Sequence, residues 1–269
     1  MINEAKSVAI AAALEAGNYM KRQFLQPSFV HEKGNDGDLV TNVDFECERI
    51  ILQHITATFP THQIQSEEFG DNGYESEWLW LIDPLDGTNN FALDLPLFSV
   101  SISLMYKKKA VLSVIYEPMV DQLYCAIEGE GSYVNNEQFT MTRTEKELRQ
   151  LSVAWIQGHH VQRTREAVLL RQHIDTYCKR MIRTWAPTLV WNMLAKGKLD
   201  GIVLYDSEGY DLYSGMLMVK EARGEIIDFD GRDVSQMLSR PKLIACHANK
   251  KSQMLQLVNE GLQSKEPIR

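Results

Sequence analysis

Apolar side chains recur at helical spacing in two stretches near the start of the chain. Across residues 3–24, small apolar residues return every three or four positions, which predicts a closely packed helix with Asn3 as its N-cap. A second stripe begins at Val43 and predicts another helix, which Pro60 helps to end. The polar, glycine-containing segment 31–38 that lies between them predicts an exposed loop.

Strand patterns follow the second helix. The continuous apolar run 78–82 is typical of a strand buried on both faces, although periodicity alone does not exclude a short helix. Residues 98–106 alternate apolar with small or polar side chains, which predicts a half-buried strand. The lysines at 107–109 predict a solvated turn after it. Further strands are expected at 111–116 and 123–127.

The second half of the chain alternates strand and helix patterns. Strands are expected at 151–156, 181–184, 201–205, 225–229 and 243–246. Helices are expected at 163–179, 188–196, 212–221 and 249–262. No repeat or linker interrupts the pattern, so we expect two α/β halves, residues 1–145 and 146–269, that form one unit around a shared site.

Composition narrows the class of protein. The chain has 269 residues, 44% of them hydrophobic, which is enough for a large core. It has no apolar run of membrane-spanning length and no pattern of a signal peptide at its start, so we expect a cytoplasmic protein. The four cysteines are widely separated and predict buried, reduced thiols. A net charge of −8 without a basic stripe argues against a nucleic-acid polymer as partner.

Two carboxylates follow the buried run 78–82 at once. Asp83 and Asp86 are three residues apart, and they are separated by Pro84, whose ring restricts the backbone. Gly87 comes next and allows conformations that other residues resist. This pattern predicts a rigid turn at the carboxyl end of a strand, where open α/β sheets bind ligands. Taken alone, it also fits a plain turn with solvated aspartates.

Other acids have comparable settings, and each has a plain structural interpretation. Asp44 fits a capping box with Thr41, a Glu67-Glu68 pair is usually solvated, and Asp211 fits a helix N-cap. Together, such acids could form a cluster of oxygen ligands without a nearby Cys or His group, which indicates a hard cation such as Mg²⁺. Acids gathered around one cleft would repel each other strongly without bound metal.

The motif that contains these acids resembles a known signature. Residues 78–91, WLWLIDPLDGTNNF, are similar to the D-P-x-D-G-T-x-N-F motif of the inositol monophosphatase family, which consists of metal-dependent, lithium-sensitive phosphomonoesterases. Residues 38–44 resemble the D-L-V-T-x-x-D motif of that family, and residues 66–68 resemble its G-E-E motif with Ser66 in place of glycine. Residues 210–224 resemble its W-D-x-A-A-G-x-x-I-V-x-E-A-G-G motif.

The resemblance implies an αβαβα sandwich of the inositol monophosphatase and fructose-1,6-bisphosphatase type. It also implies two or three Mg²⁺ ions, a small phosphorylated substrate, a homodimer and no membrane partner. In the family pattern the first ion would be bound by Glu67, Asp83 and the Leu85 carbonyl. The second ion would be bound by Asp83, Asp86 and Asp211.

The remaining roles also follow from the resemblance. Thr88, supported by Asp44, would orient the attacking water, which Glu67 helps to activate. The backbone N–H groups of Gly87 and Thr88 would contact the phosphate. Other candidates for the phosphate or substrate side are the following: Lys33, Arg183 and Ala186. No covalent phosphoenzyme is implied.

Departures from the family pattern fall where the substrate is recognised. The G-T-A-A segment that commonly follows a strand-end arginine is replaced by residues 186–189, APTL. Leu204 stands where inositol-cleaving members have a glutamate, and Asp206 or Glu208 are the nearby acids. In the last motif Tyr210 replaces tryptophan and Arg223 replaces glycine.

Three functions therefore stay open at this stage. The first, which we predict, is Mg²⁺-dependent hydrolysis of a small, inositol-phosphate-like monoester by metal-activated water. The second is a nucleotide phosphatase acting on adenosine 3′,5′-bisphosphate or NADP, or a fructose-1,6-bisphosphatase, on the same fold. The third is a catalytically silent regulator that binds metal or ligand. The His159-His160 pair belongs to no motif and is expected on the surface or in a loop.

Overall fold

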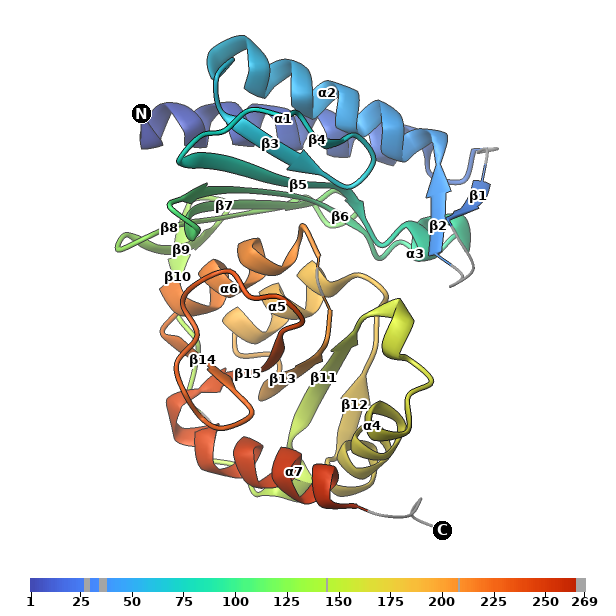
Figure 1. Cartoon of the computed structure of the whole chain (residues 1–269), viewed down its shortest axis with the longest axis vertical. Coiled ribbons are helices and arrows are strands. Elements are labelled where there is room, and N and C mark those ends of the chain that lie inside the picture. Colours follow the sequence, from blue (N-terminus) through green and yellow to red (C-terminus); the bar gives the residue numbers. More distant parts are fainter. Residues whose placement is uncertain (27–29, 34–37, 144, 208, 265–269) are drawn as a thin grey trace.

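The chain folds into five layers that alternate helices and sheets (Figure 1). The computed structural model describes residues 1–26, 30–33, 38–143, 145–207 and 209–264. The outer helix pair α1 and α2 covers one face of an eight-stranded sheet, and α5 and α6 lie between this sheet and a five-stranded sheet (Figure 1). Helices α4 and α7 cover the far face of the smaller sheet. The expected αβαβα fold is confirmed.

The helices begin and end close to the expected positions. Their bounds are α1 Ile2–Gln23, α2 Asn42–Thr58, α3 Thr88–Ala92, α4 Arg165–Tyr177, α5 Pro187–Ala195, α6 Leu212–Glu221 and α7 Lys251–Gln263. Three 3₁₀ turns accompany them: η1 Leu148–Gln150, η2 His159–Val161 and η3 Ala248–Lys250. The expectation that Asn3 caps α1 is wrong, because the helix already begins at Ile2 and Met1 precedes it.

The larger sheet has the order β10-β9-β8-β7-β6-β5-β3-β4, and only β3 and β5 pair in parallel. Its strands are β3 Gln63–Ser66, β4 Gly70–Asp71, β5 Trp78–Asp86, β6 Ser99–Tyr106, β7 Lys109–Glu117, β8 Gln122–Ile127, β9 Gly131–Val134 and β10 Glu137–Phe139. The turn expected at 107–109 is confirmed, since Lys107 and Lys108 have left-handed φ values of 48° and 66° between β6 and β7.

The smaller sheet has the order β12-β11-β13-β15-β14. Its strands are β11 Ser152–Gln157, β12 Arg180–Ile182, β13 Gly201–Tyr205, β14 Gly224–Asp228 and β15 Lys242–His247. Strand β11 pairs in parallel with β12 and β13, and β15 runs antiparallel to its neighbours. The carboxyl end of β11 therefore leads, through η2, to the side of the molecule where α5 begins.

Two expectations about extended segments need correction. The central strand does not turn at Asp83: β5 continues to Asp86 through a shift in its pairing with β6, and the turn comes at Gly87. The segment expected as a loop at 31–38 contains paired backbone, because β1 (Val30–Lys33) and β2 (Asp38–Thr41) form an antiparallel pair. Residues 34–37 lie outside the described part of the chain.

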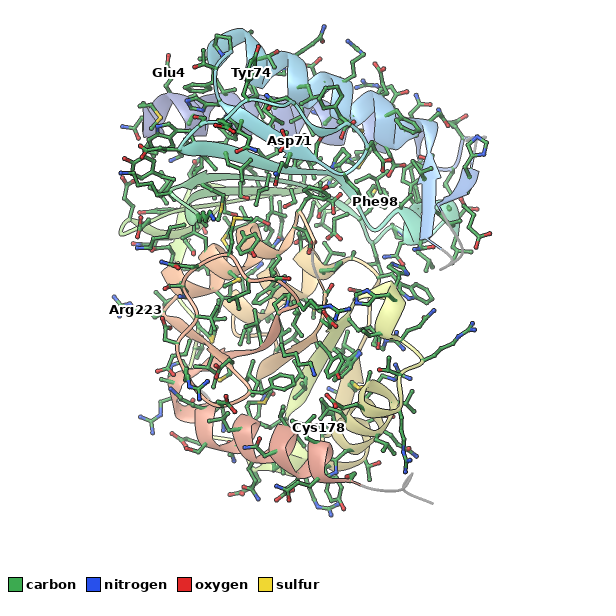
Figure 2. The ribbon with its side chains drawn as sticks, in the orientation of Figure 1. Glu4, Asp71, Tyr74, Phe98, Cys178 and Arg223 are labelled. Atoms are coloured by element: carbon green, nitrogen blue, oxygen red, sulfur yellow. The ribbon has the colours of Figure 1, made fainter. Side chains whose placement is uncertain are left out.

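Aromatic packing fixes the short helix α3 beside the end of β5. Phe98 lies at the α3 end of the larger sheet (Figure 2), and its ring centroid is 5.1 Å from those of Phe24 and Phe91. Phe91 belongs to α3, so the phenylalanine of the sequence motif anchors the helix that follows Gly87. Burial of the Phe91 and Phe98 rings, with the partly buried Phe24 packed against them, holds the turn between strand and helix in place.

The middle layer depends on a close approach between α5 and α6. A Cβ atom on Gly215 would lie 2.2 Å from the Trp191 ring of α5, which is fully buried. Glycine at this position of α6 therefore makes room for the indole. The contact sets the two helices side by side, with Thr188 near the start of one and Asp211 at the start of the other.

The thiol side chains are buried, as the sequence analysis predicts. All four cysteines are buried and unpaired. Arg223, which replaces a motif glycine, has a left-handed φ of 68° and extends away from the molecule (Figure 2). Its side chain is exposed, so replacing the glycine requires no space inside the protein. No helix in the described part of the chain is long and apolar enough to span a membrane.

We expect Gly215→Ala to lower the free energy of unfolding by about 1–2 kcal/mol, because overpacking against Trp191 outweighs the helix propensity gained. Chemical denaturation monitored by tryptophan fluorescence measures this change. A variant as stable as the parent would show that α5 and α6 can separate without cost.

Candidate active site

A cavity of about 480 Å³ lies where the end of β5 faces the start of α6 and the β11–α4 connection. Its lining includes the acidic residues of three sequence motifs: Glu67, Asp83, Asp86 and Asp211. It also includes Leu85, Gly87, Thr88 and Arg183 from the predicted set. The structure thus brings together residues that lie up to 144 positions apart in the chain, from Glu67 to Asp211.

The end of β5 is shaped by its own short-range contacts. The Leu85 N–H donates to Asp83 Oδ1 at 3.1 Å, which turns the peptide where the pairing with β6 shifts. Gly87 has φ of 102°, and a Cβ atom there would lie 2.7 Å from the Leu97 carbonyl oxygen. Both the backbone angle and the lack of space require glycine at this position.

Thr88 and Asp44 form a buried pair at the start of α3. The Thr88 hydroxyl lies 2.8 Å from Asp44 Oδ1 and 3.0 Å from the Leu85 carbonyl oxygen. The other oxygen of Asp44 accepts from the Thr41 N–H at 2.8 Å and the Thr41 hydroxyl at 2.6 Å. Asp44 therefore caps α2 and also contacts Thr88. Burial raises the pKa of the Asp44 carboxyl to about 6, against the effect of these hydrogen bonds.

Asp86 has a partner that the sequence did not reveal. The Thr188 N–H donates to Asp86 Oδ2 at 2.9 Å, and the Thr188 hydroxyl donates to the same oxygen. Ser99 on β6 lies 2.5 Å from that hydroxyl, so the three side chains form one buried group. A threonine after Pro187 fits the first turn of a helix, but this local signal does not indicate a contact with Asp86.

The backbone next to Glu67 is held by a second acid on α2. Glu48 Oε1 accepts from the N–H groups of Glu68 and Phe69, each at 3.0 Å, and the Glu48 side chain is buried. Glu48 lies one helical turn after Asp44, so a single helix face supports both Glu67 and Thr88. The spacing of four residues between Asp44 and Glu48 was the only feature of the sequence that indicated this shared helix face.

Asp211 occupies the N-cap position of α6, as the capping interpretation expects, but its side chain makes no capping hydrogen bond. The residue has a helical backbone conformation and is buried. A Cβ atom on Gly209 would lie 2.0 Å from Asp211 Oδ1, so glycine lets this carboxylate lie against the preceding turn. Asp211 then lines the cavity together with Asp83 and Asp86.

Burial and mutual repulsion dominate the electrostatics at this end of the cavity. Burial first, and then neighbouring carboxylates, raise the pKa values of Asp83 and Asp86 well above their usual range. The pKa of Asp211 rises to about 7 by burial and by the charge of Glu67. No described Lys, Arg or His forms an ion pair with these three aspartates.

The donor set is oxygen only, which fits a hard divalent cation. Buried aspartates without a cationic partner need compensating positive charge when they are ionised. In the described part of the chain, no three His, Cys, Asp or Glu residues stand ready-made in the geometry of a metal site. The oxygen donors therefore suit a divalent cation by their chemistry. The side chains would reach their final positions when the cation binds.

The other predicted residues lie in different positions. Ala186 is fully buried behind the turn, where its Cβ would be 3.0 Å from a Cβ on Gly87. Leu204 is buried in the core between the two sheets. The backbone of Lys33 pairs with Asp38, but the Lys33 side chain and Glu208 lie outside the described residues.

Much of the remaining cavity lining comes from segments without a family motif. His159 and His160 are exposed, as expected, but they line the cavity, which the sequence did not indicate. They belong to η2, directly after β11. The residues Gln157, Gln162, Trp155, Trp185 and Tyr210 line the cavity as well. Tyr210 precedes Asp211 in the last family motif, but only tertiary packing of the second half brings the others to this place.

Comparisons with known proteins agree with the geometry. A model of the inositol monophosphatase family matches residues 1–264. The Nus factor SuhB of Escherichia coli K12 is 32% identical over 238 residues, with 84% of this chain and 85% of the relative covered. Inositol monophosphatase 2 of Solanum lycopersicum is 30% identical over 270 residues, covering 97% of this chain and all of the relative.

Solved structures show the same fold. The crystal structure of the extragenic suppressor protein suhB from Bartonella henselae has a TM-score of 0.86 and 26% identity, and the match covers 97% of this chain and 99% of that chain. The family match spans nearly the whole sequence and includes every motif that lines the cavity. The chain therefore belongs to the inositol monophosphatase family and is a phosphoric monoester hydrolase.

Proposed function

We propose that this phosphatase hydrolyses a small phosphate monoester by Mg²⁺-dependent attack of water, as an inositol monophosphatase-like enzyme. The observation that carries the proposal is the group of buried carboxylates that lines one end of the cavity beside the Thr88–Asp44 pair. A buried cluster of this kind destabilises the fold when it is ionised without compensating positive charge, which favours a bound cation at this place. A small phosphorylated substrate follows from the family.

The proposed metal ligands are those of the family pattern. Glu67, Asp83 and the Leu85 carbonyl would hold one Mg²⁺ ion, and a second ion would be held by Asp83, Asp86 and Asp211, with two or three ions in all. When bound, the metal would neutralise charge on the phosphate and carboxylates and favour ionisation of water. Thr188 restricts Asp86 to one orientation because it occupies one of the two carboxylate oxygens.

The chain's own groups would position the reactants. The Thr88 hydroxyl donates its hydrogen bond to Asp44 Oδ1, so the Thr88 oxygen can accept a hydrogen bond from the attacking water. This contact would orient the water so that a lone pair points toward the phosphorus atom. Thr88 would therefore contribute to catalysis by positioning the water. The N–H groups of Gly87 and Thr88 would contact the phosphate oxygens. Water attacks directly, so no phosphoenzyme forms.

The substrate and assembly are further parts of the proposal. Inositol 1-phosphate is the first candidate ester; adenosine 3′,5′-bisphosphate, NADP and fructose 1,6-bisphosphate are the alternatives. Lithium inhibition, a homodimer and a cytoplasmic location are proposed from the family resemblance. Release of phosphate from any of these esters, abolished by chelator and restored by Mg²⁺, is the expected result. Folded protein that binds Mg²⁺ but releases no phosphate would favour the silent regulator.

Asp86→Asn is expected to keep the fold and to lower kcat by at least about 100-fold, because the amide keeps an acceptor for Thr188 but removes a negative charge from the site. Asp71→Asn is a matched control, since Asp71 is an exposed residue of β4 (Figure 2) and should leave kcat unchanged. Phosphate release and circular dichroism measure both. Parental turnover in Asp86→Asn would remove Asp86 from the site.

Thr88→Val and Thr88→Ser separate shape from hydrogen bonding. Valine fills the same space without a hydroxyl, so kcat should fall by about 10²–10⁴-fold. Serine keeps the hydroxyl near Asp44 and should stay within about tenfold of the parent. Equal rates for the two variants would contradict the role assigned to the Thr88 hydroxyl.

Mg²⁺ should stabilise the protein more at high than at low pH. The raised pKa values, about 6 for Asp44 and about 7 for Asp211, mean that the metal-free folded state retains protons that the unfolded state has released. Stability from this cluster is therefore lost as pH rises from about 4 through about 7. We expect the difference in Tm between Mg²⁺ and chelator to be larger at about pH 8 than at about pH 5. The same difference in Tm at both pH values would show that these acids do not bind Mg²⁺.

A further inference from the structure

Thr188 and Ser99 surround one oxygen of the Asp86 carboxylate. Asp86 Oδ2 accepts a hydrogen bond from the Thr188 N–H at 2.9 Å and another from the Thr188 hydroxyl. Ser99 Oγ lies 3.4 Å from the same carboxylate oxygen and 2.5 Å from the Thr188 hydroxyl oxygen. Thr188 and Ser99 are fully buried. Because a carboxylate oxygen has two lone pairs, the two donors of Thr188 already fill Oδ2.

The carboxylate fixes the direction of these hydrogen bonds. An ionised carboxylate only accepts, so the Thr188 hydroxyl donates to Asp86 and its oxygen is left as an acceptor for Ser99. The three groups therefore form a chain in which Ser99 donates to Thr188 and Thr188 donates to Asp86. Hydrogen bonds in such a chain strengthen one another. The start of α5 contributes as well, because the N-cap residue Ala186 provides no side-chain cap and Asp86 accepts from the first turn instead.

The other oxygen of Asp86 remains available to the cavity. Among the residues that the structure describes, none donates a hydrogen bond to Asp86 Oδ1. Asp86 lines the cavity, where the neighbouring aspartates need positive charge when they are ionised. A cation in the cavity can therefore reach Asp86 through Oδ1, while Oδ2 is held against α5.

The residue that holds Asp86 is a departure from the family pattern. Thr188 is the third residue of the segment 186–189, APTL, and the corresponding position of the G-T-A-A segment is alanine. An alanine would keep the backbone N–H but would have no hydroxyl for Asp86 or Ser99. The departure thus changes the contacts of a proposed metal ligand.

Strand β6 supports the neighbouring helix start by a similar contact. Ser101 Oγ lies 2.7 Å from Ser214 Oγ, and the Ser214 hydroxyl donates to the Asp211 carbonyl oxygen at 2.6 Å. Ser99 and Ser101 are two residues apart on β6, so they share one face of the strand. One strand therefore positions both Asp86 and the start of α6, where Asp211 lies.

We propose that Thr188, supported by Ser99, determines which cation the site accepts, because it restricts Asp86 to binding through Oδ1 alone and so favours Mg²⁺ over Ca²⁺. Mg²⁺ requires a small, nearly octahedral set of oxygen ligands, which single carboxylate oxygens suit. Ca²⁺ takes about six to eight oxygen ligands and often uses both oxygens of a carboxylate. The filled Oδ2 does not offer that second contact. This inference rests on the proposed Mg²⁺-dependent phosphatase function and identifies a positioning residue for its cation.

Substitutions at Thr188 and Ser99 test this role by cation affinity. Thr188→Val removes the hydroxyl with little change in volume, so Asp86 can turn and offer both oxygens. The dissociation constant for Ca²⁺ divided by that for Mg²⁺ should then fall about tenfold. Thr188→Ser keeps the hydroxyl and should stay within about twofold of the parent, and Ser99→Ala should lower the ratio about two- to fivefold. Calorimetric titration of the metal-free protein with each cation alone measures the ratio.

Ser103→Ala is the control for loss of a buried hydroxyl on the same strand. Ser103 lies on the same face of β6 as Ser99 and is equally buried, but its hydroxyl has no hydrogen-bond partner among the described residues. This variant should keep the parental ratio. Circular dichroism checks that each variant is folded, and Ser99→Ala tests the same chain of hydrogen bonds if Thr188→Val does not fold.

Crystals soaked with Ca²⁺ provide a second measurement that does not depend on activity. The ion should contact Asp86 through Oδ1 alone in the parent and through both oxygens in Thr188→Val. A parental ratio of dissociation constants in folded Thr188→Val, or Ca²⁺ bound by both Asp86 oxygens in the parent, would overturn this inference while the phosphatase function stands. Parental protein that binds no cation at Asp86 and releases no phosphate with Mg²⁺ would overturn both.

Discussion

Burial of carboxylates at one end of a central strand is the constraint on which the rest of the structure depends. Asp83 and Asp86 are held on β5, and burial together with mutual repulsion raises their pKa values well above the usual range. Such a cluster costs stability when it is ionised without compensating charge. The fold therefore has to supply rigid support around it, and the proposed metal supplies the positive charge.

That support comes from two layers of helices. On one side, α2 uses Asp44 to hold Thr88 and Glu48 to hold the turn after Glu67. In the middle layer, α5 places Thr188 against Asp86, and α6 begins directly after Asp211. The contact of Trp191 with Gly215 fixes the two helices relative to each other. The site is thus assembled from helix starts and strand ends that the layered fold brings to one edge (Figure 1).

Sequence patterns predicted the elements and the acidic end of the cavity because those features are local. The apolar stripe of α2 and the D-P-x-D-G-T string need no tertiary information. The pairing of Thr188 with Asp86 joins residues 102 positions apart, and no local pattern encodes it. The continuation of β5 past Asp83 was missed, because the shift in pairing lets the strand pass Pro84 without a turn.

The rest of the cavity lining could not be predicted for the same reason. His159, His160 and Trp185 belong to connections whose spatial neighbours are set by how the second half packs. An exposed tryptophan leaves no periodic signal in the sequence. Its left-handed backbone is visible only in the folded chain, where Asn90 and Thr184 hold it.

Crystals soaked with Mn²⁺, which takes the same oxygen ligands as Mg²⁺, test the central claim most directly. The account predicts anomalous difference peaks in contact with the carboxylates of Asp83, Asp86 and Asp211, and their loss in Asp86→Asn crystals. Mn²⁺ bound elsewhere, or no peak at these aspartates in crystals of protein that releases phosphate, would contradict it.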